Sequence, residues 1–332
     1  MHCLRWPPAL PLLLMACQAQ AAAPPLLRKV TDVPLPGAAS RFDYASLDPG
    51  RGRLYLNHMG AGEVVVFDIR TRKVAAVLKG FPRCTGILAV PTLDRVFVST
   101  PGDGHVVALD GKTYAVLARL PAGRFPDGIA FEAGSGRIFV SDEAGGAVTA
   151  IDASALKVLK QIPLGGEAGN TQADSEAHIV YTNDQTNGDL VVIDPVDLEV
   201  KARVPLGVKG NHGLYLDLPR NLAFIASETN NELLVLDLAG RKITAHFPLG
   251  RGPDVLSFDT GSRRLYVASE SGTLSVFRES GAGLVKEGEP NVGPNAHVVI
   301  VDPASHLLYL PLKEVDGHPV LRILEPVLPA TP

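Results

Sequence analysis

The chain has 332 residues, a formal net charge of −4 at neutral pH and three cysteines. With 31 basic against 35 acidic residues and no basic cluster, the composition argues against binding of nucleic acid or anionic lipid through the protein surface. Two cysteines lie within the first seventeen residues, which leaves Cys84 without a partner for an intramolecular disulfide.

The N-terminal segment, residues 1–17, has the pattern of a secretory signal. It carries one cation, Arg5, followed by an apolar stretch at 10–15 that is too short to span a membrane. The sequence Leu-Met-Ala-Cys at 14–17 resembles a bacterial lipobox, so Cys17 is a candidate for lipidation, with residues 18–26 as a tether. The alternative is ordinary cleavage near residue 21, after Ala-Gln-Ala.

A repeated pattern fills the remainder, residues 27–327. An apolar run ending in a small or polar residue is followed by a turn, a second apolar run and an aspartate, as from Leu54 to Asp68. Seven copies begin at 54, 96, 138, 180, 223, 265 and 308, with intervals of 42 or 43 residues. Short β runs at this period predict an all-β fold, a seven-bladed β-propeller with four strands in each blade.

The last copy lacks a fourth strand, because the chain ends soon after the apolar run at 320–324. Residues 29–37, near the N-terminus, repeat the fourth-strand pattern found at 157–165 and 242–250. We therefore expect the N-terminal strand to complete the last blade and close the ring, which removes free sheet edges. A closed ring implies that 27–327 is one domain.

The repeats resemble those of the YncE-like family of seven-bladed propellers, which are built from YVTN repeats. The resemblance is carried by residues 42–49 with 53–55, by Pro-Asp-Gly-Ile-Ala-Phe at 126–131, and by residues 297–309. It covers nearly the whole chain after the signal segment. It implies a propeller fold and an exported, periplasmic bacterial protein, which lipidation would anchor to the outer membrane.

Ligands of propellers bind where the inner strands meet at the mouth of the central channel. One position of each inner strand, eleven residues before the second strand, defines a ring with one member in each blade. Its members are Asp43, Thr85, Asp127, Gly169, His212, Asp254 and His297. Asn211, Asn170, Asn295 and Arg83 flank this ring, and the loops between second and third strands on the same face carry His58, Asp142, Glu143, Asp184, Glu228, Glu270 and Lys313.

The ring residues allow two interpretations. Asp43, Asp127 and Asp254 are candidate ligands of a divalent metal, and His212 and His297 are candidate acid or base groups. Alternatively, each aspartate orders a turn through its backbone N–H groups. We expect Asp43, Asp127, Asn211, His212, Asp254, Asn295 and His297 to form a ligand-binding set, and His58 to be a solvated loop residue.

Three functional hypotheses follow. The first is a noncatalytic exported scaffold that binds a small ligand or an envelope protein on the channel face, since no hydrolase, haem or dinucleotide motif is present. The second is a metal-assisted lactonase or lyase with its site at the channel mouth, which rests on fold analogy. The third, an accessory subunit of a periplasmic redox system, has no support from any residue. No cofactor other than a divalent metal is indicated.

Overall fold

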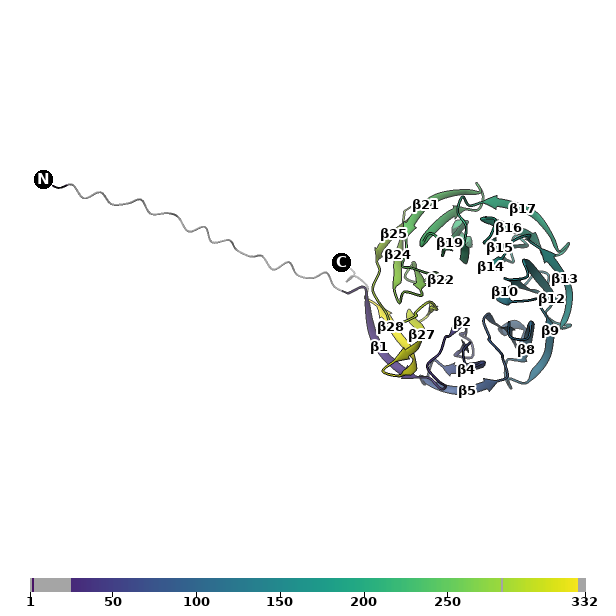
Figure 1. Cartoon of the computed structure of the whole chain (residues 1–332), viewed down its shortest axis with the longest axis horizontal. Helices are drawn as coiled ribbons and strands as arrows, with labels where there is room; N and C mark the ends of the chain where they lie inside the picture. The colour runs from purple at the N-terminus through teal and green to yellow at the C-terminus, as the bar shows by residue number, and fades with distance from the viewer. Residues whose placement is uncertain (1, 3–24, 282, 328–332) are drawn as a thin grey trace.

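The structure, a computed structural model, describes residue 2 and residues 25–281 and 283–327. Within these ranges the chain forms seven four-stranded antiparallel sheets around a central channel, which is a seven-bladed β-propeller (Figure 1). The predicted all-β fold is therefore confirmed. Apart from residue 2, the predicted signal segment with Cys17, and the tether as far as residue 24, lie outside the described residues.

Each of the first six blades takes four strands that are consecutive in the sequence, with the first strand nearest the channel. Blades one to three consist of β2 Asp43–Asp48, β3 Arg53–His58, β4 Glu63–Asp68, β5 Lys73–Lys79; β6 Ile87–Val90, β7 Arg95–Thr100, β8 His105–Asp110, β9 Val116–Pro121; and β10 Pro126–Glu132, β11 Arg137–Asp142, β12 Ala147–Asp152, β13 Lys157–Pro163. Blades four to six consist of β14 Ala168–Asp174, β15 Ile179–Asp184, β16 Asp189–Asp194, β17 Glu199–Pro205; β18 Asn211–Asp217, β19 Leu222–Ser227, β20 Glu232–Asp237, β21 Lys242–Pro248; and β22 Pro253–Asp259, β23 Arg264–Ser269, β24 Leu274–Ser280, β25 Gly283–Gly288.

Blade seven closes the ring with strands from both ends of the chain. Its inner strands are β26 (Ile300–Asp302), β27 (Leu307–Val315) and β28 (His318–Pro326), and its outer strand is β1 (Leu27–Pro34). β1 runs antiparallel to β28 with Val33 opposite Leu321, and Figure 1 shows the purple N-terminal strand beside the yellow C-terminal ones. The predicted closure is confirmed: the N-terminal strand completes the last blade, and β1 is its outermost strand.

The aspartate that ends the third strand in each early repeat has a local structural role. Asp68 Oδ1 accepts hydrogen bonds from the backbone N–H groups of Arg70 and Thr71, both at 2.9 Å. Asp152 Oδ1 accepts the equivalent pair from Ser154 and Ala155, at 2.9 and 2.7 Å. These aspartates order the turn between the third and fourth strands, which explains their recurrence.

The hydrophobic core lies between neighbouring blades. In one cluster Tyr55 and Val64 of blade one pack with Val96 and Val98 of blade two, and all four side chains are buried. Both faces of the second and third strands are covered in this way, which accounts for the continuous apolar runs at these positions. A single blade therefore depends on its neighbours for burial.

Regular helix is limited, in the described part of the chain, to two 3₁₀ turns at Pro91–Leu93 and Leu218–Arg220. No helix within these ranges combines the length and apolarity that a membrane-crossing segment needs.

Candidate functional site

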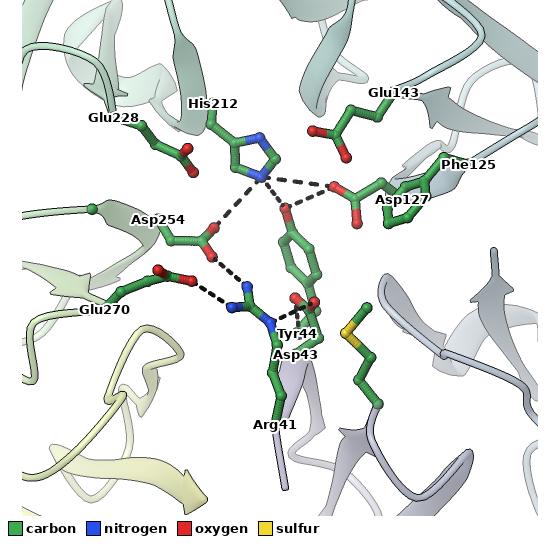
Figure 2. Close-up of a pocket in the computed structure, with 12 residues that line it drawn as sticks. Arg41, Asp43, Tyr44, Phe125, Asp127, Glu143, His212, Glu228, Asp254 and Glu270 are labelled. Carbon is green, nitrogen blue, oxygen red and sulfur yellow. Dashed lines mark hydrogen bonds and ion pairs between the residues drawn. The ribbon is translucent and has the colours of Figure 1, made fainter. Parts of the chain in front are cut away.

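A cavity of about 310 Å³ opens at one mouth of the central channel (Figure 2). Its wall combines residues of the inner strands with residues of the loops that join second and third strands. The lining residues are Arg41, Asp43, Tyr44, Met59, Phe125, Asp127, Glu143, His212, Glu228, Gly252, Asp254 and Glu270. The prediction that the loop residues Glu143, Glu228 and Glu270 share this face is confirmed.

The small polar residue next to the end of the second strand holds the inner strand of the next blade. Ser99 Oγ donates a hydrogen bond to the carbonyl of Asp127 (2.7 Å), and Asn183 Nδ2 donates one to the carbonyl of His212 (3.1 Å). Glycines allow the same strands to approach closely: a Cβ at Gly86 would lie 1.9 Å from the Asp127 carbonyl oxygen. The repeat motif thus fixes the backbone that presents the ring side chains.

A hydrogen-bonded network crosses the floor of the cavity. His212 Nε2 lies 3.0 Å from the Tyr44 hydroxyl, 3.5 Å from Asp254 Oδ1 and 3.7 Å from Asp127 Oδ2. The Tyr44 hydroxyl lies 2.6 Å from Asn170 Oδ1 and 3.2 Å from Asp127 Oδ2. Figure 2 shows the tyrosine ring projecting between the two aspartates toward the imidazole.

Burial and mutual repulsion displace the pKa values of these groups. Burial, reinforced by the charge of Asp127, raises the pKa of Asp43 to about 7, although Arg41 opposes the shift. Burial raises the pKa of Asp127 to about 6 against the attraction of His212, and burial raises the pKa of Asp254 well above its usual value. These carboxyl groups therefore retain protons more strongly than exposed ones.

The same surroundings favour the charged form of His212. Burial alone would lower its pKa, but the carboxylates led by Asp254 and Asp127 outweigh burial and raise the pKa to about 9. A protonated imidazole donates from both nitrogens. Nε2–H then donates to the Tyr44 hydroxyl, which in turn donates to Asn170 Oδ1.

Arg41 enters the cavity from the segment that joins β1 to β2. Its guanidinium pairs with Glu270 and lies 3.6 Å from Asp43 and 3.8 Å from Asp254. These three carboxylates raise the pKa of Arg41 although burial opposes the shift. The prediction for His58 is wrong: its side chain is fully buried, because it stacks on the adjacent Phe42 ring with centroids 4.1 Å apart.

The predicted ligand-binding set divides into three groups. Asp43, Asp127, His212 and Asp254 line the cavity. His297 is buried behind its wall, where its ligating atom and those of Asp43 and Asp254 lie within 4.8 Å of one another. Asn211 and Asn295 do not line the cavity: the Asn211 amide donates to the Val208 carbonyl (2.7 Å).

The predicted metal-ligating set is not brought together in the combination expected. Asp43 and Asp254 lie near each other, but the third compatible group is His297, whereas Asp127 lies on the other side of the Tyr44 hydroxyl. The blades of Thr85 and Gly169 contribute no ring side chain to the lining. Lys313, expected on a loop, lies within β27.

Arg41, Tyr44, Met59 and Phe125 line the cavity but were not among the residues predicted for it. Tyr44 directly follows a ring position in the sequence, which is a signal that could have been used. Arg41 belongs to the segment before the first repeat, so the repeat alignment holds no information about it.

The described lining has six carboxyl side chains and two cationic ones, Arg41 and His212. Such a surface repels anions and favours a positively charged group. The rings of Tyr44 and Phe125 add aromatic faces suited to contact with a cation.

No protein-family model matches the chain, and no curated protein sequence matches it. Solved structures do match over nearly its whole length. A chain of the "Crystal Structure of Mitotic Checkpoint Complex" aligns with a TM-score of 0.77 at 12% identity, covering 96% of this chain and 98% of that one. A chain of "Kuenenia stuttgartiensis Hydrazine Synthase" aligns with a TM-score of 0.70 at 15% identity, covering 92% and 99%.

A third structure, "Crystal structure of RRP9 WD40 repeats", aligns with a TM-score of 0.75 at 9% identity, covering 90% of this chain and 97% of that one. At such low identities the similarity shows the fold alone, a WD40-like seven-bladed β-propeller.

Proposed function

We propose that this protein is an exported, YncE-like propeller that binds a positively charged group at the acidic channel mouth without transforming it. The group is an ammonium or guanidinium, carried by a small ligand or by a basic side chain of an envelope protein. The observation that carries the proposal is the lining of the cavity, with its excess of carboxyl groups over cations. The fold, the repeat motifs at 42–49 and 297–309 and the signal pattern support the remainder of the proposal.

The protonation of the site makes the proposal specific. Asp43 and Asp127 have raised pKa values, of about 7 and about 6, because both carboxyl groups are buried and because other carboxylates, Asp127 for Asp43 and Glu143 for Asp127, lie near them. A bound cation stabilises the ionised carboxylates and lowers these pKa values. Binding therefore releases protons near neutral pH, and this release is absent when a cation binds to an ordinary exposed acidic surface.

The size of the cavity suits one side-chain-sized group. A volume of about 310 Å³ is at the lower end of the range of small-molecule sites. Phosphate-rich partners are disfavoured by the same carboxylates, in keeping with the prediction of no nucleic-acid partner.

Calorimetry with defined probes tests the proposal. Agmatine and a lysine-containing peptide are titrated into the protein, and a glutamate-containing peptide serves as the anionic probe. Paired titrations in buffers of different ionisation enthalpy report proton release. We expect binding of a cationic probe with proton release, and which probe binds distinguishes a small ligand from a peptide partner.

Variants at the cavity rim sharpen this experiment. Glu228→Gln is expected to weaken cation binding by roughly 1 kcal/mol, about fivefold, because Glu228 lines the cavity and is exposed. Glu199→Gln removes an exposed carboxylate from the outer strand β17 and should leave binding unchanged. Equal binding of the anionic probe, or equal effects of the two substitutions, would refute the proposal.

Export and anchoring are tested separately at Cys17. If Cys17 is lipidated, the Cys17→Ser variant lacks the acyl chains, has a lower mature mass and no longer fractionates with the outer membrane. Unchanged mass and fractionation would favour ordinary cleavage near residue 21. Accumulation of the unprocessed chain in the cytoplasm would contradict export itself.

A metal-assisted lactonase or lyase is the second candidate. It is favoured by one observation, the proximity of Asp43, Asp254 and His297, with His212 available as a proton donor. Hydrolysis of a lactone panel that is lost on chelation and restored by metal would support it. Absence of turnover in protein shown to contain metal would remove it.

A further inference from the structure

Two buried polar atoms beside the cavity lack hydrogen-bond partners. They are His297 Nε2 and Asp254 Oδ1: neither makes a hydrogen bond among the described residues, although Asp254 Oδ1 lies 3.5 Å from His212 Nε2. The two side chains belong to residues that are 1% and 4% exposed. A buried polar atom without a hydrogen bond destabilises the fold, so such atoms call for an explanation, and a bound ion is one of the established explanations.

The tautomer of His297 leaves a lone pair on Nε2. Its Nδ1 lies 3.1 Å from the carbonyl oxygen of Asn295, and a carbonyl only accepts, so Nδ1 carries the hydrogen. A neutral imidazole with one nitrogen donating to a carbonyl is the usual form of a metal-binding histidine.

The His297 imidazole lies near two carboxylates from different blades. One ligating atom each from Asp43, Asp254 and His297 lie within 4.8 Å of one another. Ligands that share a first-row metal, each at about 2.0–2.2 Å from it, also lie within this distance of one another. One imidazole and two carboxylates suit a first-row divalent ion such as Zn²⁺ or Mn²⁺, with further positions left for water.

Arg41 occupies the place of a counterion in the structure. Its distances to Asp43 and Asp254, 3.6 and 3.8 Å, exceed those of a good hydrogen bond. Its contact with Glu270 is closer, and its side chain is 37% exposed. A divalent ion can therefore replace the guanidinium between the two aspartates while Arg41 keeps its contact with Glu270.

We propose that Asp43, Asp254 and His297 form a binding site for a first-row divalent metal ion, and that Arg41 competes with the ion for the two aspartates. The site shares Asp43 and Asp254 with the cavity wall, but its formation does not require the cationic ligand proposed above. A competing set, His212 with Glu228 and Asp254, also has ligating atoms close together. It is disfavoured because the His212 imidazole already contacts the Tyr44 hydroxyl at 3.0 Å.

Metal titration of the intact protein tests the site. Protein freed of metal with a chelator is titrated calorimetrically with Zn²⁺ and Mn²⁺, and metal retained after desalting is measured by mass spectrometry. We expect one ion per chain. His297→Gln and Asp43→Asn should each weaken binding about tenfold or more, by analogy with the loss of groups that support metal sites.

Three further variants make the outcome decisive. Arg41→Gln should tighten metal binding because the competing cation is gone. His212→Gln should weaken binding less than His297→Gln does, although it removes a contact with Asp254. His246→Gln, which removes an imidazole that is half exposed and remote on β21, should leave binding unchanged. Circular dichroism confirms that each variant is folded.

Two results would overturn the proposal: no stoichiometric metal in either the parent protein or the Arg41→Gln variant, or loss of metal with His212→Gln but not with His297→Gln. Titration of agmatine in the presence of chelator measures the cationic-ligand site independently, so failure of one proposal is distinguished from failure of the other.

Discussion

The ion pair between Asp32 and Arg322 should stabilise the closed ring. Asp32 lies on β1 and Arg322 on β28, so the pair joins strands from opposite ends of the chain. Arg322 Nε and Nη2 donate to the two carboxylate oxygens at 2.8 and 2.6 Å. The perturbation is a double-mutant cycle of Asp32→Ala, Arg322→Ala and the double variant, which removes the separate contribution of the Arg322 contact with Val292.

The size of the coupling free energy between Asp32 and Arg322 follows from the geometry and burial of the pair. The two side chains are only 17% and 19% exposed, so the pair is screened less than a surface pair. Charged hydrogen bonds contribute about 1.5–3 kcal/mol, and partial solvent access places the expected coupling near the lower limit, about 1.5 kcal/mol. For a domain of roughly 300 residues this corresponds to a change in Tm of about 2–3 °C.

The stabilisation that the Asp32–Arg322 pair contributes depends on pH in a defined direction. The hydrogen bond with Arg322 lowers the pKa of Asp32 below its ordinary value of 3.8. The stabilisation is therefore fully present above the unfolded-state pKa and is lost as the pH falls through the folded-state pKa. The coupling should be constant from neutral pH to about pH 5 and should shrink below about pH 4.

Urea denaturation at several pH values measures the coupling. The control is a second cycle on Arg28 and Glu325, which join the same two strands but have side chains 70% and 31% exposed. This control pair should show a coupling of about 0.5 kcal/mol or less. A coupling for Asp32 and Arg322 no larger than that of the control, or one unchanged at pH 3, would refute the reasoning.

Three further predictions concern packing. Gly86→Ala should lower the free energy of unfolding by about 1–3 kcal/mol, because the new Cβ would meet backbone at 1.9 Å. Gly283→Ala, where a new Cβ would meet no atom within 4 Å, should change this free energy little. Urea denaturation of both variants measures the difference. Phe97→Ala should cost about 3–5 kcal/mol, since the ring is fully buried between blades two and three. Val196→Ala, at a side chain 62% exposed, should stay within about 0.5 kcal/mol in the same assay. Cys84 should resist a thiol reagent until the protein unfolds, because burial raises its pKa; rapid labelling of its peptide in native protein would contradict this.

Much of the architecture was predictable because a propeller repeats one unit. The period of 42 or 43 residues set the number of blades, the recurring aspartates marked the third turns, and the displaced strand at 29–37 indicated how the ring closes. Each inference depended on local hydrogen bonding or on burial between identical neighbours. Both leave a periodic trace in the sequence.

The same periodicity located the ring positions. Asp43, Asp127, His212 and Asp254 were expected at the channel mouth, and the structure places them there. Their backbone is set by contacts that recur from blade to blade.

Only the tertiary structure decided how these side chains combine. Arg41 comes from the one segment of the wall that lies before the first repeat, and the alignment could not locate it. Likewise the Tyr44 hydroxyl separates Asp127 from Asp254, and it contacts Asn170 and His212 of two further blades. Such contacts join residues of different blades across the axis. They depend on side-chain direction in three dimensions, and a one-dimensional period carries no record of that direction.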